Sequence, residues 1–290
     1  MFPMRQRTVQ CSNLGGLHRM AYTEWGDPRN PQVLVCVHGL TRCGRDFDFL
    51  AASLAPEYRV VCPDVVGRGC SDWLKNKAMY GLPQYVADMV TLIARLDVEQ
   101  VDWLGTSMGG LIGMGLAAQE NTPIARLILN DVGPVVTAAS LARIGEYVGR
   151  DPRFDTLEQA EQFVRAVSAT FGRHTDAQWR HLTEHVVRTA ADGKIEFRYD
   201  PGIAESYRQA MVDGQDIELW PIYDAIRCST LVIRGADSDL LLPGTVAQMA
   251  QRGPRARSVD IPAVGHAPML MDSTQVEVVR RFLSDVSSGC

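Results

Sequence analysis

The chain of 290 residues lacks several features that mark whole classes of protein. Its net charge is -5, with both signs interspersed and no basic patch, so nucleic acid is not an expected partner. No apolar stretch approaches the length of a membrane span, and we expect no membrane partner. The N-terminal segment Met1–Arg7 is followed by Thr8, Val9 and Gln10 rather than by an apolar run, so no signal peptide is expected.

Paired cysteines are also missing. The seven cysteines are an odd number and are scattered, without metal-like pairs such as Cys-x-x-Cys. Cys36 and Cys62 lie in apolar runs, where cysteine behaves as a small apolar residue. The sequence therefore predicts a reduced, cytoplasmic protein without a metal, and it does not define the oligomeric state.

The glycine-rich turns lack the residues that bind phosphates. The turn Gly67-Arg68-Gly69 has no third glycine of a dinucleotide fingerprint and is not followed at once by a helix. The stretch from Gly105 to Gly110 has no lysine of a P-loop. We expect no cofactor, and we interpret residues 67–69 as a tight turn that shapes the floor of a site.

What the chain does contain is a regular alternation of strand-like and helical segments. Helical spacing of apolar residues marks helices over 86–93, 108–119 and 275–285. This alternation predicts an α/β fold, with a mostly parallel central sheet and helices on both faces. Residues 17–22 could add an antiparallel hairpin at the edge. Short apolar runs predict buried strands at 33–37, 59–62, 101–104, 126–130, 230–234 and 258–261.

Residues 135–219 interrupt the alternation. Their pattern is mainly helical, with separate helices over 141–144, 157–171 and 177–188 and no convincing central strand. We predict a helical cap over 135–219, inserted into a core made of residues 1–134 and 220–290. Open α/β sheets bind ligands at the carboxyl ends of their strands, which is where such an insertion would lie.

The pentad Gly105-Thr106-Ser107-Met108-Gly109 stands between an apolar run and a helical stretch. A sharp strand-to-helix turn at this point would lift the Ser107 hydroxyl above the sheet, where a base can reach it. By itself the pentad is a weak signal, because glycine is common and chance matches occur.

Four further motifs occur in the expected order around the pentad: His38-Gly39, Pro63-Asp64-Val65-Val66-Gly67-Arg68-Gly69-Cys70-Ser71, Arg234-Gly235-Ala236-Asp237-Ser238-Asp239 and Val264-Gly265-His266. With them, the chain resembles the α/β-hydrolase superfamily, in its capped serine esterase-like branch. The resemblance implies that Ser107 is the nucleophile, that His266 is its base, and that carboxylic esters are cleaved through an acyl-enzyme. It also implies an oxyanion hole made of the backbone N–H groups of Leu40 and Met108.

The acid that orients His266 has three candidates. The family's usual spacing places it about three residues after the glycine of the late strand, where this chain has Ser238. In branches where an aspartate follows that serine, Asp239 fits, so we predict Asp239, with Asp237 as the alternative. Asp131 is a third candidate, because some family members carry the acid after the preceding strand. We expect His38 to brace its loop through a hydrogen bond.

The residues expected to line the substrate pocket lie at strand ends or at the root of the cap. Arg42 and Arg45 are candidates for contact with an acidic group of the substrate, although such side chains more often form surface ion pairs. The sequence does not identify the small-molecule ester. The expected substrate-binding residues are Leu40, Thr41, Arg42, Met108, Val135, Val136 and Leu240.

Four alternative functions remain open. Carbon–carbon bond hydrolases of the ring-cleavage type, and cofactor-free haloperoxidase-like enzymes, share the same triad. The segment His181-Leu182-Thr183-Glu184-His185 matches an inverted zinc-peptidase motif, but no obvious third ligand follows it. A binding protein without catalysis would usually lack one member of the triad, and this chain has candidates for all three.

Overall fold

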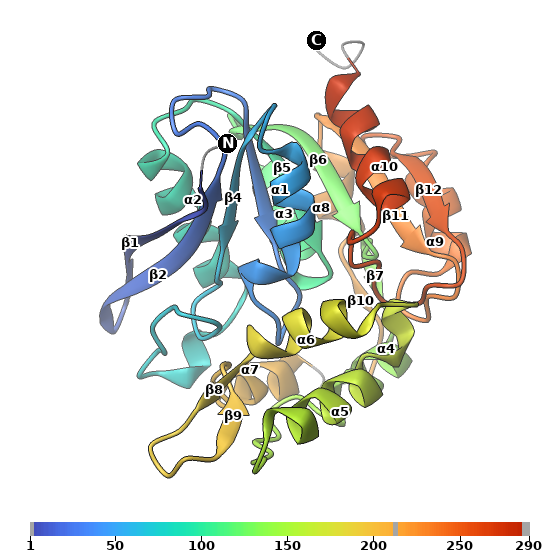
Figure 1. The fold of residues 1–290 in the computed structure, drawn as a ribbon. Coiled ribbons are helices and arrows are strands. Elements are labelled where there is room, and N and C mark those ends of the chain that lie inside the picture. The colour runs from blue at the N-terminus through green and yellow to red at the C-terminus, as the bar shows by residue number, and fades with distance from the viewer. Residues whose placement is uncertain (1–2, 211–213, 286–290) are drawn as a thin grey trace.

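A computed structural model describes residues 3–210 and 214–285. Eight of its strands form one sheet in the order β1-β2-β4-β3-β5-β6-β11-β12 (Figure 1). The six strands from β4 to β12 in this order are parallel to one another. At the other edge, β2 pairs antiparallel with β4, and β1 pairs antiparallel with β2. The sheet consists of β1 (Arg5–Asn13), β2 (Gly16–Trp25), β3 (Val33–Val37), β4 (Arg59–Pro63), β5 (Val101–Thr106), β6 (Ile124–Asn130), β11 (Ser229–Gly235) and β12 (Arg257–Ile261).

The predicted fold class is confirmed. Every predicted parallel strand is present, and the expected hairpin at the sheet edge is formed by β1 and β2. Strand β3 is buried along its whole length, because helices cover both faces of a parallel sheet. Cys36 and Cys62 lie in this buried region, as the apolar runs around them predict.

Helices cover the two faces of the sheet in separate groups (Figure 1). On one face, α1 (Asp48–Leu54) and α10 (Ser273–Ser284) contribute Leu50 and Phe282 to one hydrophobic cluster. On the other face, α2 (Leu82–Arg95), α3 (Met108–Ala117), α8 (Trp220–Ala225) and α9 (Pro243–Met249) contribute to a larger cluster. A short turn of 3-10 helix, Gly44–Phe47, leads into α1, and another spans Lys77–Met79.

The segment 135–219 lies beyond the carboxyl ends of the parallel strands, where Figure 1 shows it below the sheet in colours from green through yellow to orange. Among its described residues, none joins the eight-stranded sheet. It contains β7 (Val135–Val136), α4 (Ala138–Gly145), α5 (Leu157–Val167), a 3-10 turn (Ala169–Phe171), α6 (Asp176–Glu184), β8 (Val187–Thr189), β9 (Ile195–Phe197), α7 (Ile203–Ala210) and β10 (Ile217–Glu218).

Local sequence explains where the helices of this segment begin and end. Thr156 and Thr175 accept hydrogen bonds from backbone N–H groups in the first turns of α5 and α6, and Thr175 forms a capping box with Gln178. The predicted helix over 177–188 is too long at its end, because α6 stops at Glu184 and residues 187–189 pair with β9 instead.

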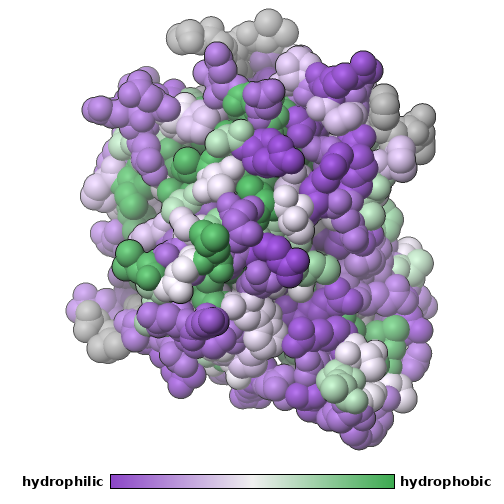
Figure 2. Space-filling model, turned by 90° about the vertical axis from the view of Figure 1, so that its left-hand side faces the viewer, coloured by the Kyte–Doolittle hydropathy of each residue, from purple (hydrophilic) through white to green (hydrophobic). Residues whose placement is uncertain are grey.

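The side of the molecule that carries β1 and β2 has hydrophobic patches interrupted by hydrophilic residues (Figure 2). Leu14 and Leu17, at and beside the turn between these strands, are among the exposed large hydrophobic residues. Over the described ranges, none of the helices combines the length and hydrophobicity that a bilayer crossing requires.

Candidate active site

Ser107 occupies a strained turn between β5 and α3. Its backbone φ is 52° and its ψ is -116°, a conformation that non-glycine residues rarely adopt. The turn is tight because the helix lies against the strands: a Cβ on Gly109 would come within 2.0 Å of the Val37 carbonyl oxygen. The Ser107 N–H donates to the Asn130 carbonyl at 3.0 Å, which ties the turn to β6.

His266, in the loop after β12, contacts both a hydroxyl and a carboxylate. Its Nε2 lies 3.0 Å from the Ser107 Oγ, and its Nδ1 lies 2.6 Å from Oδ2 of Asp131. In this arrangement the Nδ1–H donates to the carboxylate and leaves Nε2 free to accept the serine proton. The fold therefore brings together Ser107 and His266, two residues 159 positions apart in the sequence.

The carboxylate at His266 is that of Asp131, and this corrects the expectation of Asp239. Asp131 is fully buried and accepts two more hydrogen bonds, from the Ser238 hydroxyl at 2.7 Å and from the Gly235 N–H at 2.8 Å. Asp239 instead pairs with Arg143, at 2.6 and 3.0 Å, and its side chain is 50% exposed.

The reason for this difference is the direction of the side chains after β11. In the sequence Asp237-Ser238-Asp239, both aspartates are exposed and the serine between them is buried. Ser238 thus fills the inward position where the usual family spacing would place the acid. The buried carboxylate is that of Asp131, the residue directly after β6, and Ser238 donates a hydrogen bond to it.

Asn130, the residue before Asp131, connects the loops that carry the three groups. Its amide Nδ2 donates to the Thr106 hydroxyl and to the Pro268 carbonyl, at 2.8 Å in both cases. These bonds join the ends of β5 and β6 to the His266 loop. The positions of Ser107, Asp131 and His266 are therefore coupled through one buried side chain.

The loop after β3 is braced by His38, as the sequence predicts. The buried His38 ring donates from Nδ1 to the Gly39 carbonyl at 2.7 Å, and its Nε2 accepts from the Val65 N–H at 2.9 Å. Burial lowers the pKa of His38 to about 3, so the ring stays neutral. Arg68 donates to the Leu40 carbonyl at 2.9 Å and holds the same loop.

The two backbone groups expected in the oxyanion hole come from elements on either side of Ser107. Leu40 lines the cavity at Ser107. Met108 is the first residue of α3, so its N–H has no acceptor within the helix. An oxyanion hole made of these two groups stays a prediction.

A cavity of about 100 Å³ opens at Ser107 between the core and the segment 135–219. Of the expected pocket residues, Leu40, Thr41 and Arg42 line it, together with Ser107 and His266. The opposite wall is mainly apolar and comes from the segment 135–219. It includes Ile144, Tyr147, Phe163, Val164, Val167, Phe171, Val186 and Phe197.

Four expected pocket residues lie outside this lining. The buried Met108 side chain turns away, with its sulfur 3.5 Å from Nη2 of Arg68. Val135 and Val136 form β7, which pairs with β10, and Leu240 is packed in the larger hydrophobic cluster. The aromatic wall was missed because helical periodicity shows that a helix has an apolar face, but not what that face covers.

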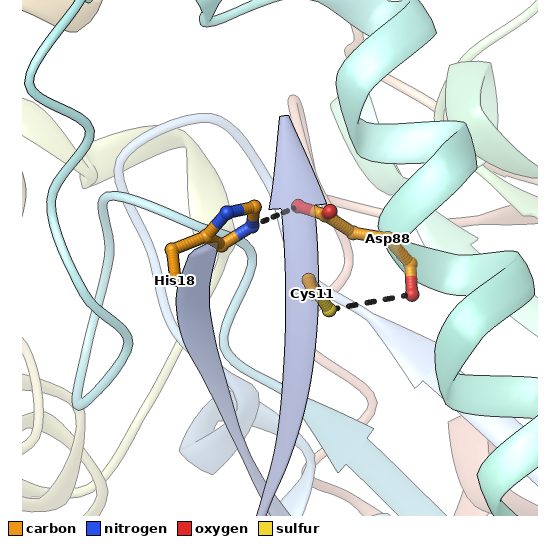
Figure 3. A group of neighbouring side chains, drawn as sticks. All are labelled: Cys11, His18 and Asp88. Carbon is orange, nitrogen blue, oxygen red and sulfur yellow. Dashed lines mark hydrogen bonds and ion pairs between the residues drawn. The ribbon is translucent and has the colours of Figure 1, made fainter. Parts of the chain in front are cut away.

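A second cluster combines a thiol, an imidazole and a carboxylate at the edge of the sheet. Cys11 and His18 come from β1 and β2, and Asp88 comes from α2 (Figure 3). His18 Nε2 lies 3.0 Å from Asp88 Oδ2, and Gln84 donates to the other carboxylate oxygen at 2.7 Å. Burial raises the pKa of the Cys11 thiol to about 12, so the thiol stays protonated at neutral pH.

These three donor types could in principle hold a metal ion, since their ligand atoms lie within 4.8 Å of one another. However, the carboxylate already has a hydrogen-bond partner on each oxygen. Hydrogen bonding alone therefore accounts for the buried pair.

The histidines of the inverted zinc-peptidase motif have a carboxylate beside them that the sequence does not reveal. Asp48 of α1 lies with its Oδ2 3.4 Å from Nε2 of His181, and His185 completes the group. The Asp48 carboxylate is held by Arg45 at 2.7 and 2.9 Å. Neither histidine lines the Ser107 cavity, and neither does Arg45, which was a candidate for contact with the substrate.

Comparisons with known proteins find similar sequences and similar folds. The model of the Alpha/beta hydrolase family matches residues 34–281. The chain is 51% identical over 282 residues to a 3-hydroxybutyrate-oligomer hydrolase of Cupriavidus necator, covering 95% of this chain and 96% of that protein.

Solved structures show the same fold. One is the X-ray structure of a putative hydrolase from Rickettsia typhi, with a TM-score of 0.89 and 32% identity over 97% of this chain and 99% of that one. Another is an alpha/beta hydrolase from Novosphingobium aromaticivorans, with a TM-score of 0.86 and 36% identity over 99% of this chain and 100% of that one.

Proposed function

Since this chain belongs to the alpha/beta hydrolase family, we propose that it cleaves the ester bonds of short 3-hydroxybutyrate oligomers through an acyl-enzyme at Ser107. The observation that carries the proposal is the continuous set of hydrogen bonds from Asp131 through His266 to Ser107, at the wall of a cavity. The substrate class comes from the relative that shares 51% of its residues.

In the first half of the proposed reaction, the Ser107 Oγ attacks the ester carbonyl carbon while His266 Nε2 takes the hydroxyl proton. The carbonyl oxygen becomes negative, and the N–H groups of Leu40 and Met108 stabilise it. When the tetrahedral intermediate collapses, the bond to the alcohol oxygen breaks. His266 returns its proton to that oxygen, and the acyl group remains on Ser107.

In the second half, water attacks the acyl-enzyme with His266 again as the base. The bond between the carbonyl carbon and the Ser107 Oγ breaks, and the serine regains its proton from His266. From a dimer, the two steps give two molecules of 3-hydroxybutyrate. Asp131 holds the His266 tautomer in both steps and stabilises the imidazolium that forms in each.

The segment 135–219 acts in this proposal as a cap that shapes the acyl and alcohol subsites. Its wall of aromatic and branched side chains, including Phe163, Phe171 and Val167, is suited to the methyl-bearing backbone of a hydroxybutyrate chain. The cavity is small, about 100 Å³, so the wall should favour short oligomers over polymer.

The test combines turnover with covalent labelling. The wild-type protein should hydrolyse the 3-hydroxybutyrate dimer, and a fluorophosphonate should add one adduct that peptide mass spectrometry places on Ser107. Ser107→Ala should abolish both. Ser168→Ala is a matched control, because Ser168 also lines the cavity but, within the described residues, its hydroxyl has no hydrogen bond to a histidine. This variant should still take up the label.

Turnover that survives in Ser107→Ala would contradict the assignment of Ser107 as the nucleophile. A folded wild-type protein that turns over neither the dimer nor p-nitrophenyl esters would contradict ester hydrolysis. Carbon–carbon bond cleavage by the same triad would then become the leading alternative.

A further inference from the structure

The cavity at Ser107 is lined by more positive than negative side chains. Three arginines, Arg42, Arg143 and Arg150, face it, and Asp46 is the one carboxylate among its described lining residues. The chain as a whole carries a net charge of -5. A local excess of guanidinium groups in an acidic protein favours an anionic ligand at this place.

Two of these arginines already have carboxylate partners. Arg42 makes two bonds to Asp46, at 2.8 and 2.5 Å, and it donates to the Leu182 carbonyl at 3.2 Å. Arg143 makes two bonds to Asp239, at 2.6 and 3.0 Å. Their charges are therefore largely neutralised by bidentate pairs.

Arg150 differs from both. Within residues 3–210 and 214–285 its guanidinium has no hydrogen bond or ion pair to a carboxylate, although its main chain is held on both sides. The Arg150 N–H donates to the Tyr147 carbonyl at 3.1 Å, and the Arg150 carbonyl accepts from the buried Tyr199 hydroxyl at 2.7 Å. An anchored backbone thus presents an uncommitted cation at the cavity wall.

We propose that Arg150 binds the free carboxylate of the substrate, and that the enzyme therefore prefers hydroxyacid oligomers with an ionised end over their neutral esters. This inference rests on the proposed function, because an oligomer of a hydroxyacid carries one free carboxylate per chain. Arginine is suited to the task, since its planar guanidinium can bond both carboxylate oxygens.

The chemistry of the oligomer also fixes which part of it Arg150 holds. In each ester bond, the free carboxylate belongs to the alcohol side, which leaves when the acyl-enzyme forms. Arg150 lies on the segment 135–219, and Ser107 lies on the core. The substrate would then span the cavity, with its carboxylate on the cap side and its scissile carbonyl at the core.

Arg150 makes this contact before as well as during the reaction, so its loss should raise KM more than it lowers kcat. Loss of a bidentate, charge-assisted contact to the carboxylate should lower the affinity about tenfold. Because Arg150 is exposed to salt, the preference for the acid should weaken as ionic strength rises.

The first arm of the test compares the 3-hydroxybutyrate dimer with its methyl ester. For the wild type, kcat/KM should be higher for the acid, and Arg150→Gln should reduce the ratio of acid to methyl ester about tenfold. Arg150→Lys should restore part of the ratio. Arg153→Gln is the matched control: it removes one charge three residues away, from a side chain that pairs with Glu196 and does not line the cavity.

The second arm measures binding without turnover, in the Ser107→Ala background, by titration calorimetry. The acid dimer should bind more tightly than its methyl ester, and adding Arg150→Gln should remove the difference. If the acid binds in this way but the wild type does not cleave it, the proposed function falls, while Arg150 remains a carboxylate-binding residue of the cavity. Equal affinities for acid and ester, or a preference that survives Arg150→Gln, would overturn the inference.

Discussion

Among the described residues, two fully buried aspartates each pair with a histidine, one at the cavity and one at the edge of the sheet. In the first, His266 contacts Asp131 at 2.6 Å, and in the second, His18 contacts Asp88 at 3.0 Å. The two aspartates are equally inaccessible, with exposed fractions of 0% and 1%. Each carboxylate also accepts other hydrogen bonds, so the two carboxylates are alike in burial and in bonding.

The two pairs differ in the group that the second ring nitrogen of the histidine contacts. His266 Nε2 faces the Ser107 hydroxyl at the wall of a cavity, whereas His18 Nδ1 faces the Asn13 amide at 3.3 Å. The nearby Cys11 thiol lies 4.0 Å from the Asp88 carbonyl, and no hydrogen bond joins it to His18 within the described chain (Figure 3). A histidine–aspartate pair is therefore a common structural unit, and the group at the other nitrogen decides whether it can do chemistry.

The largest effect should come from removing the hydroxyl that distinguishes the two pairs. Ser107→Ala should lower kcat for ester hydrolysis by about 10⁴-fold or more, because the base then has no nucleophile to activate. Thermal unfolding should change little, since the side chain lost is small. Steady-state kinetics with thermal melts of both proteins checks this, and a loss of less than tenfold would contradict the assignment.

Disrupting the His18–Asp88 pair at the sheet edge should instead lower the free energy of unfolding and leave catalysis nearly unchanged. His18→Phe leaves the buried Asp88 carboxylate without its partner, which should cost about 3–5 kcal/mol of unfolding free energy. Urea denaturation measures the loss, and kcat per folded molecule should stay within about twofold. The double variant His18→Phe/Asp88→Leu is the control, because it removes the unpaired charge and should recover part of the stability. A selective loss of kcat would show that this pair is not merely structural.

A third histidine, His38, shows what burial without a carboxylate does. Its folded-state pKa is about 3, whereas an ordinary histidine has a pKa of 6.5, so the unfolded chain takes up a proton that the folded chain refuses. The free energy of unfolding should therefore be at its full value above about pH 6.5 and should fall as the pH decreases toward 3. Between about pH 7.5 and pH 5, protonation of this histidine in the unfolded chain should lower the free energy of unfolding by about 2 kcal/mol.

His38→Gln should reduce that pH dependence, measured as the difference in urea midpoints of the two proteins over the same pH range. Identical pH profiles for the wild type and the variant would show that His38 titrates normally in the folded protein. The comparison within one pair of proteins cancels the contribution of all other titrating groups.

The smallest effect is expected at Cys11. Cys11→Ala removes a buried thiol that behaves as a small apolar group and should cost only about 1 kcal/mol of stability, with kcat unchanged. Thermal melts and ester kinetics check this. A loss of activity comparable to that of Ser107→Ala would mean that the thiol, and not the serine, carries the reaction.

The sequence was sufficient for those parts of the site that depend on local pattern. The strand before Ser107, the helix after it and the loop that carries His266 follow from apolar runs and glycine-flanked turns, and the structure has all three. The role of His38 could also be predicted, because a histidine at a strand end has few partners other than nearby backbone.

The acid and the pocket wall could not be predicted in the same way. Choosing Asp131 over Asp239 requires knowing which side chain after β11 points inward. A shift of one residue in this loop would turn Asp237 or Asp239 inward in place of Ser238. A signal was available, since a serine stands where the family spacing places the acid. The lining residues Phe163 and Phe171 depend on how the helices of the segment 135–219 dock on the core, which no local pattern encodes.

The most direct test of the account compares Asp131→Asn with Asp239→Asn in ester hydrolysis. Asparagine keeps the shape of each side chain but removes the charge that stabilises the imidazolium of His266. Asp131→Asn should lower kcat by about 10³–10⁴-fold, and Asp239→Asn, which only breaks the exposed pair with Arg143, should change it by less than about threefold. Near-wild-type kcat in Asp131→Asn, or a large loss in Asp239→Asn alone, would contradict the triad of Ser107, His266 and Asp131.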